Sequence, residues 1–419
     1  MLRFNFKKIS QVPGDFFIKR KEITDYLKKI KSILKERSYD FPESFLLLPE
    51  ESPDLPKRFF KNLRLERKEI KVIIVVGVGG SSLGIQAVFE ALKRKKGLKE
   101  ILFLDSLNPL FLRAIKNKLD SCSGRKCQSA IFLISKSGKT FETLANFFTL
   151  LKLIRRYLPK IFIITNENSS LWEFGKKKNY PLLPLPKMVG GRFSIFSNLG
   201  LFPFYLSGID TRELFLGAKR ANEICLKDYP SRNPSLASAL TIFYHWKDGK
   251  NIYSNFVFPP DLEFFGKWYI QLMGESLGKE GKGITPTVTV GTSDFHAIGQ
   301  LYFDGPRDKL INFVFVEKLG LDSEIPTDKN LDNLFPEVKG KKLWQVNKAI
   351  FEGVKRAYQK KKIPFTETIL PTLNERNLGF LLEMKMIEII FLAKLMRVNA
   401  FDQPGVELYK AETRKILKI

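Results

Sequence analysis

The amino-acid sequence predicts an α/β protein of two three-layer α/β/α domains with parallel sheets, and three observations lead to this fold class. Short apolar runs rich in β-branched residues alternate with longer segments of helical character. These runs form two series, one in each half of the chain. The 419 residues also exceed the length that one hydrophobic core usually supports. We therefore expect an N-terminal arm over 1–54, a first domain over 55–212, a second domain over 213–400 and a short C-terminal tail over 401–419.

The predicted strands of the first domain carry apolar residues at successive positions, where a half-buried strand would alternate apolar and polar ones. Such runs are typical of parallel strands that helices cover on both faces. The predicted strands of the first domain span residues 72–76, 101–104, 130–134 and 161–165. After a long helical region over 211–246, those of the second domain span 252–258, 285–290 and 312–316.

The apolar segment 378–401 contains charged residues, and their number decides between a membrane span and a buried helix. It carries Glu383, Lys385, Glu388 and two further basic residues. Charges at that frequency exclude a membrane span and predict a long buried helix. Because the N-terminal segment also holds no apolar run of signal-peptide length, we expect a cytoplasmic protein.

Composition narrows the class of protein further. With 44% hydrophobic and 13% aromatic residues the chain has enough apolar surface to fold, which excludes intrinsic disorder. The net charge of +26 fits a nucleic-acid partner, an anionic substrate or a lysine-rich surface, and the scattered lysines favour the surface. Three cysteines indicate a reducing compartment. Cys122 and Cys127 lie five residues apart, but with only two histidines in the chain we expect no zinc site.

A glycine-rich loop over 77–84 follows the first predicted strand and has three interpretations. A dinucleotide-binding G-x-G-x-x-G pattern fails because Ser82 replaces the third glycine, although Asp105 after the next strand would suit a ribose contact. A nucleophile elbow, G-x-S-x-G, fits residues 80–84 with His296 downstream, but further residues separate it from the strand. The third interpretation is a phosphate loop, in which glycines let the backbone approach an anion.

A second polar loop follows the third predicted strand. Its sequence Gly138-Lys139-Thr140 is similar to the end of a Walker A loop, but Leu133 stands where that motif needs a glycine. What remains is a dense set of hydroxyl donors at a strand-to-helix turn, Ser135, Ser137, Thr140 and Thr143. One such cluster is usually an ordinary turn. Two of them after neighbouring strands of one sheet can converge on a single phosphate.

Six blocks, taken in order along the chain, resemble the glucose-6-phosphate isomerase family in its shorter bacterial form. Two blocks are the loops just described. The other four are GGRFSIFSNLGLFP (190–203), QLMGESLGKEGKG (271–283), GTSDFHAIGQ (291–300) and DQPGVELYK (402–410). The resemblance implies two sugar-isomerase (SIS) domains and a homodimer that interconverts glucose 6-phosphate and fructose 6-phosphate without a metal or other cofactor. The expected partner is a sugar phosphate, with neither nucleic acid nor a membrane.

The resemblance also implies catalytic roles for four residues. Glu275 matches the base that moves a proton between C1 and C2, and Arg192 matches the cation that stabilises the enediolate. His296 matches the ring-opening histidine, which in the family reaches the site from the other subunit, and Lys410 matches a lysine that assists ring opening. These residue types suit the reaction, because isomerisation through an enediolate needs a base, an acid for ring opening and a positive charge beside the developing oxyanion.

The substrate-binding residues that the resemblance implies come from both loops and from two later blocks. The phosphate is expected at Gly80, Ser81, Ser135, Lys136, Ser137 and Thr140, and the sugar hydroxyls at Gln271 and Gln403. Because Gln271 and Glu275 are four residues apart, a helix would place both on one face. The chain departs from the family pattern at Lys139, Phe141, Pro404 and Tyr409.

Two alternative functions remain open from the sequence. A related isomerase would accept mannose 6-phosphate as well, because the pocket differences that decide the C2 epimer cannot be read from these motifs. A non-catalytic SIS-domain sensor of sugar phosphates would need a DNA-binding segment, and the basic N-terminal 70 residues are its only candidate.

Overall fold

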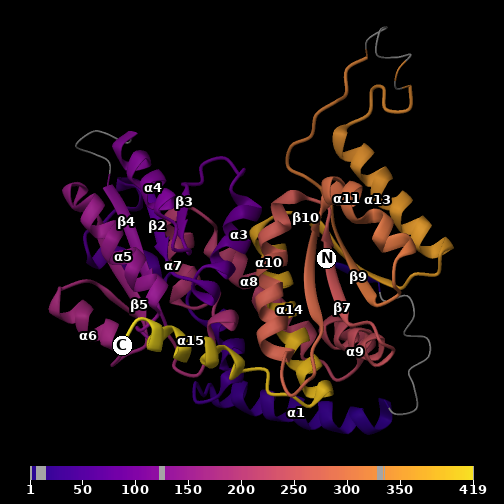
Figure 1. The fold of residues 1–419 in the computed structure, drawn as a ribbon, viewed down its shortest axis with the longest axis horizontal. Helices are drawn as coiled ribbons and strands as arrows, with labels where there is room; N and C mark the ends of the chain where they lie inside the picture. Colours follow the sequence, from indigo (N-terminus) through magenta and orange to yellow (C-terminus); the bar gives the residue numbers. More distant parts are fainter. Residues whose placement is uncertain (1, 6–15, 122–127, 328–333, 335, 419) are drawn as a thin grey trace.

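The computed structural model describes every residue except 1, 6–15, 122–127, 328–333, 335 and 419, and it contains two five-stranded sheets (Figure 1). The first sheet is parallel throughout and has the order β3 (Ile101–Leu104), β2 (Ile70–Val76), β4 (Gln128–Ile134), β5 (Lys160–Thr165) and β6 (Leu182–Pro184). The second has the order β1 (Arg3–Asn5), β10 (Phe365–Thr372), β9 (Lys309–Lys318), β7 (Ile252–Val257) and β8 (Thr285–Val290). The predicted fold class is confirmed.

Helices cover both faces of each sheet. The outer face of the first sheet packs against α4 (Pro109–Ser121), α5 (Phe141–Ile154) and α6 (Ser170–Lys177). The outer face of the second packs against α11 (Gly291–Asp304) and α13 (Leu343–Lys360). The inner faces of both sheets share one continuous core with α2 (Leu55–Asn62), α3 (Leu83–Leu92), α7 (Asn198–Ser207), α8 (Thr211–Cys225), α9 (Pro234–Lys247), α10 (Glu263–Leu277) and α14 (Glu375–Met396).

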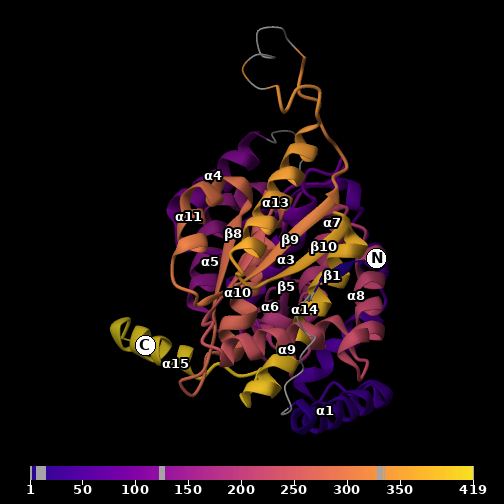
Figure 2. The same cartoon turned by 90° about the vertical axis from the view of Figure 1, so that its right-hand side faces the viewer.

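The two ends of the chain lie against and beyond this core. Helix α1 (Phe16–Glu36) contacts α14 and a 3₁₀ segment over Pro42–Glu50. Strand β1, within the expected arm 1–54, adds to the second sheet as an antiparallel edge strand beside β10, so that sheet is not wholly parallel. Helix α15 (Gly405–Ile416) has no buried residue and projects from the body in Figure 2.

Two differences from the sequence-based expectation have clear physical reasons. The helical region 211–246 divides into α8 and α9, since prolines at 230 and 234 disfavour a continuous helix and Asn233 caps the second one. Strand β10 was not expected because its centre is polar rather than apolar. Its Thr366 and Thr368 hydroxyls donate to Asn312 on β9, at 3.1 Å each, so the buried polar groups are satisfied.

The winding of the first sheet places the two predicted loops side by side. After β2 the chain crosses to β3 on one side and then returns to β4 on the other. The loops that follow β2 and β4 therefore leave the carboxyl edge at the point where the strand order reverses, which is where open α/β sheets bind ligands. This topology positions the candidate site.

Helix α14 is the predicted long buried helix, and it carries ionisable groups into the core. None of the helices among the described residues has the length and apolar character needed to cross a bilayer. Lys385 is paired with Glu388 at 2.7 Å, and Glu388 also accepts from the Tyr269 hydroxyl. Neither carboxyl oxygen of the fully buried Glu383 has a hydrogen-bond partner, and burial raises the pKa of that carboxyl well above its usual value.

We predict that Glu383→Gln stabilises the protein increasingly as the pH rises from about 5 to about 8. Burial keeps the Glu383 carboxyl protonated in the folded protein, whereas in the unfolded chain it ionises at its ordinary pKa. Above that ordinary pKa, the free energy of unfolding of the wild type therefore falls by up to about 1.4 kcal/mol per pH unit. Glutamine has no such proton to lose. Urea unfolding of both proteins at several pH values measures the difference. Glu388→Gln is the control, since it removes a paired carboxylate and should destabilise throughout. A difference for Glu383→Gln that did not change with pH would contradict the prediction.

Candidate active site

The glycine-rich loop after β2 approaches the second domain through its backbone. It forms a short 3₁₀ turn over Gly79–Ser81, and Gly79 adopts a left-handed φ of +55°. A Cβ atom on Gly79 would lie 2.9 Å from Nε2 of Gln271 on α10. Only glycine therefore lets this loop contact the helix so closely.

A second backbone contact joins the same loop to the segment that carries Arg192. A Cβ atom on Gly80 would lie 2.5 Å from the carbonyl carbon of Gly191 and 2.8 Å from the amide nitrogen of Arg192. The lack of a side chain on Gly80 thus lets the two main chains touch, while a Cβ on Gly190 or Gly191 would make only ordinary contacts. The contact places the base of the Arg192 side chain next to the loop.

The guanidinium of Arg192 is almost fully buried and is satisfied on all three nitrogens. Its Nε donates to Ser276 Oγ at 2.9 Å, and its Nη1 donates to Glu275 Oε2 at 2.9 Å and to Gln403 Oε1 at 2.6 Å. Its Nη2 donates to the carbonyls of Ala400 and Asp402, at 2.6 and 3.0 Å. Burial is the main cause that lowers the pKa of Arg192, and the neighbouring carboxylates oppose it. The guanidinium therefore stays a fixed positive charge.

Glu275 lies in the last turn of α10 and is held from two sides. Its Oε1 accepts from Gln271 Nε2 at 2.9 Å, and its Oε2 accepts from Arg192. The expected placement of Gln271 and Glu275 on one helix face is confirmed. The Glu275 side chain is 29% exposed, and each carboxylate oxygen has a second lone pair, so the group remains able to accept a proton.

The loop after β4 supplies hydroxyl groups and a second positive charge. Ser135 Oγ and Thr140 Oγ1 share a hydrogen bond of 3.0 Å, while the exposed Ser137 accepts from the Lys139 amide. Lys136 is half-buried, and burial lowers its pKa, with the positive charge of Arg192 lowering it further. Two cations that disfavour each other in this way would both gain from a dianion between them.

Two of the predicted catalytic residues lie outside this hydrogen-bonded group. His296 is exposed on α11, and within the described part of the chain it forms no hydrogen bond or ion pair. Lys410 lies on α15, where it pairs with Glu407 at 2.7 Å and holds the pKa of that carboxyl below its usual value. Among the described residues, neither forms a hydrogen bond or ion pair with Glu275.

The structure bears on the other interpretations of the first loop at two residues. Asp105 accepts a hydrogen bond of 2.6 Å from Gln86 Nε2. Ser82, the serine of the proposed elbow, is fully buried, and its hydroxyl donates to the carbonyl of Gly79. Cys122 and Cys127 lie outside the described residues. Elsewhere in the described chain no three His, Cys, Asp or Glu side chains are grouped as metal ligands.

Three residues that shape the site, Ser276, Lys279 and Asp402, were not predicted from the sequence. Ser276 fixes the Arg192 Nε, and the carbonyl of Asp402 fixes its Nη2. The ammonium of Lys279 contacts the carbonyls of Glu275 and Ser276, both at 2.9 Å. The one available signal was the spacing of Lys279, one helical turn beyond Glu275.

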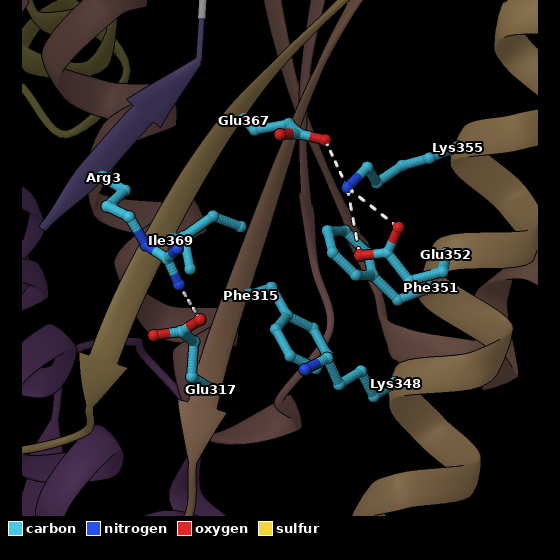
Figure 3. Close-up of a pocket in the computed structure, with 9 residues that line it drawn as sticks. All are labelled: Arg3, Phe315, Glu317, Lys348, Phe351, Glu352, Lys355, Glu367 and Ile369. Atoms are coloured by element: carbon cyan, nitrogen blue, oxygen red, sulfur yellow. Dashed lines mark hydrogen bonds and ion pairs between the residues drawn. The ribbon is translucent and has the colours of Figure 1, made fainter.

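A separate cavity of about 540 Å³ lies on the outer face of the second sheet, between α13 and the strands β1, β9 and β10 (Figure 3). It contains none of the predicted site residues. Its three carboxylates already face cations, since Glu317 pairs with Arg3 and both Glu352 and Glu367 contact Lys355. The lining therefore leaves little unbalanced charge for a ligand, and the cavity is not the candidate site.

Comparisons with known proteins show the family of the chain. Residues 65–419 match the family described as phosphoglucose isomerase. The chain is 33% identical over 349 residues to the glucose-6-phosphate isomerase of Methanocaldococcus jannaschii, covering 83% of this chain and 84% of that one. It is 33% identical over 381 residues to a glucose-6-phosphate isomerase of Thermus thermophilus, covering 88% and 89%.

Two solved structures are similar over most of their length. A crystal structure of a hypothetical protein from Thermus thermophilus superposes with a TM-score of 0.87 over 100% of both chains, at 30% identity. A glucose-6-phosphate isomerase from Chlamydia trachomatis shares the fold, with a TM-score of 0.75 over 87% of this chain and 72% of that one, at 22% identity. The fold and these relatives define an α/β aldose–ketose isomerase with two sheets. More particularly, the chain belongs to the phosphoglucose isomerase family.

We predict that Gly80→Ala destabilises the protein by about 1–3 kcal/mol, because the added methyl group forces the two backbones apart. Gly353→Ala in α13 is the matched control, since no heavy atom lies within 4 Å of its added Cβ. That change should stabilise by up to about 1 kcal/mol through helix propensity. Urea unfolding measures both, and a Gly80→Ala protein as stable as the wild type would show that the contact is not tight.

Proposed function

We propose that the protein interconverts glucose 6-phosphate and fructose 6-phosphate through an enediolate. The observation that carries this proposal is the carboxylate of Glu275, which Arg192 and Gln271 hold in one orientation beside the glycine-rich loop. A carboxylate fixed next to a permanent cation suits the reaction, since the base removes a proton from carbon while the cation stabilises the oxyanion that forms.

In this mechanism Glu275 takes the proton from C2 of the open-chain aldose and returns it to C1. The negative charge that develops on the substrate oxygen is stabilised by Arg192, whose position is fixed before the reaction by five hydrogen bonds. Because these bonds occupy the five donors of the guanidinium, Arg192 acts through its fixed positive charge, which is in place before the negative charge forms. Gln271 and Gln403, which flank Glu275 and Arg192, are placed to orient the sugar hydroxyls.

The phosphate of the substrate would bind at the loops after β2 and β4. Gly80 would line the site through its backbone, and Ser81, Ser135, Ser137 and Thr140 would supply hydroxyls. Lys136 adds a charge beside Arg192, and the repulsion between these two cations favours a dianionic ligand. The phosphate thus binds on the first domain while the base comes from the second.

Ring opening requires an acid, and we infer that it comes from a second copy of the chain. His296 is exposed on α11 and lies outside the group around Glu275, so a homodimer in which it reaches the partner's site would complete the constellation. Lys410 would join it through α15, which projects from the body (Figure 2). Free sugar phosphates are metabolites of the cytoplasm, where we expect this enzyme to act.

The alternative of a non-catalytic sensor has less support. The described part of the N-terminal 70 residues is built into the body, with β1 in the second sheet and α1 against α14. A sensor also has no use for a carboxylate held beside a buried arginine. The geometry around Glu275 therefore favours catalysis.

We predict that Glu275→Gln lowers kcat for fructose 6-phosphate by at least about 100-fold, the usual contribution of a general base, and changes KM little. The amide keeps the shape of the side chain and its contact with Gln271 but cannot accept the proton. A coupled assay of glucose 6-phosphate formation measures the loss. The control is Glu280→Gln, an exposed residue of the following turn, which should behave as wild type. If the Glu275→Gln enzyme kept nearly wild-type turnover, the assignment of Glu275 as the base would be wrong.

We also predict complementation between two inactive variants. His296→Ala and Glu275→Gln homodimers, once mixed and allowed to exchange subunits, should recover about a quarter of wild-type activity, because half of the dimers are mixed and each has one intact shared site. If His296 instead served the site of its own chain, no mixed dimer would contain an intact site. The mixture would then stay inactive.

A further inference from the structure

Lys279 is a nearly buried cation whose contacts join two separate parts of the site. Its side chain is only 7% exposed. Its ammonium donates to the main-chain carbonyls of Glu275 and Ser276, both at 2.9 Å, and to the carbonyl of Asn399. It also forms an ion pair of 3.2 Å with the carboxylate of Asp402. The three donors of the ammonium are thus divided between the end of α10 and the chain that leads to α15.

The backbone of Lys279 is fixed by a tight turn. The amide of Lys279 donates to the carbonyl of Lys282, and the amide of Lys282 donates back, at 3.1 and 2.8 Å. The two residues between them, Glu280 and Gly281, both have positive φ angles of +54° and +69°, as a type I′ turn requires. This turn reverses the chain immediately after α10 and directs the Lys279 side chain back to the end of the helix.

The end of α10 is an unfavourable place for a carboxylate unless a cation is nearby. Carbonyls of the last turn have no partner within the helix and carry a partial negative charge. Glu275 lies in that last turn, so its charge adds to theirs. The ammonium of Lys279 binds two of these carbonyls directly and offsets both charges. Burial lowers the pKa of Lys279, and the carboxylate of Asp402 opposes that effect.

The other side of Lys279 fixes the segment 399–403. Asn399 accepts from Lys279 through its carbonyl, and its Nδ2 donates to Asp402 Oδ2 at 2.9 Å. Asp402 is then held by Lys279 through its carboxylate and by Arg192 through its carbonyl. Gln403, the next residue, reaches Arg192 from this fixed segment.

We propose that Lys279 is a positioning residue that ties the base-bearing end of α10 to the segment 399–403, and so holds Glu275 and Gln403 together around Arg192. This inference rests on the proposed isomerase function, and it assigns Lys279 no contact with the substrate. Loss of the Lys279 ammonium would leave the loops after β2 and β4 unchanged, but it would misplace the carboxylate of Glu275 relative to the sugar. A misplacement of about 1 Å is enough to lower a rate about 100-fold.

The test compares steady-state kinetics of Lys279→Met, Asp402→Asn and the double variant with fructose 6-phosphate. We expect Lys279→Met to lower kcat about 30- to 100-fold, with KM and the inhibition constant of inorganic phosphate changed little. Asp402 is half-exposed, and Asp402→Asn weakens the same link while the Lys279 ammonium keeps its three carbonyl partners, so we expect a loss of about tenfold in kcat. The double variant should be no slower than Lys279→Met alone, because both changes break the same connection.

Lys282→Met is the matched control. Lys282 lies in the same turn, and among the described residues its side chain pairs only with Glu280, so this variant should keep wild-type kinetics.

Three results would overturn the proposal. The first is a Lys279→Met enzyme, folded by circular dichroism, whose kcat stays within about twofold of wild type. The second is multiplication of the two losses in the double variant, which would mean that the residues act separately. The third, which applies even if Lys279→Met fails to fold, is an Asp402→Asn enzyme with wild-type kcat. Failure of the proposed function would look different, since the wild-type protein itself would then convert neither sugar phosphate.

Discussion

The buried guanidinium of Arg192 is the interaction on which the rest of the site depends. It bonds to Glu275 and Ser276 at the end of α10, to Gln403, and to two carbonyls of the chain that leads to α15. Its own backbone is pressed against Gly80 of the first loop. A buried arginine is costly unless its donors are all satisfied, so these segments must come together for the charge to be tolerated. Arg192 thereby joins the loop after β2 to the end of α10 and to the segment that leads to α15.

The domain architecture explains why the site lies where it does. Each sheet reverses its strand order near its centre, and the loops after β2 and β4 leave the first sheet at that reversal. The second domain contributes α10, whose last turn reaches the same place because both domains share one core. Only a few of the basic residues behind the net charge of +26 lie at the candidate site, among them Arg192, Lys136 and Lys279. Most of the positive charge is distributed over the surface, where it contributes a general attraction for anions.

Much of this arrangement could be predicted from the sequence, and the remainder could not for physical reasons. Strands β2, β4, β5 and β9 were recognisable because burial on both faces demands nearly uninterrupted apolar runs. Strand β10 was not recognisable, since its buried threonines depend on Asn312 of another strand. Gln271 and Glu275 were placed on one face by their spacing alone. The partners of Arg192 at Ala400 and Asp402 are main-chain carbonyls, which every residue has and no sequence pattern marks. The shared role of Lys279 depends in the same way on carbonyls from two distant segments.

The central claim is that a single carboxylate moves a proton between adjacent carbons, and isotope exchange tests it most directly. The wild-type protein is incubated with fructose 6-phosphate in deuterated water, and the sugar phosphates are followed by NMR. Proton transfer through Glu275, whose side chain is partly exposed to water, predicts deuterium at C2 of glucose 6-phosphate and at C1 of fructose 6-phosphate. Interconversion over many turnovers with no deuterium at either carbon would indicate a hydride shift and would contradict the account.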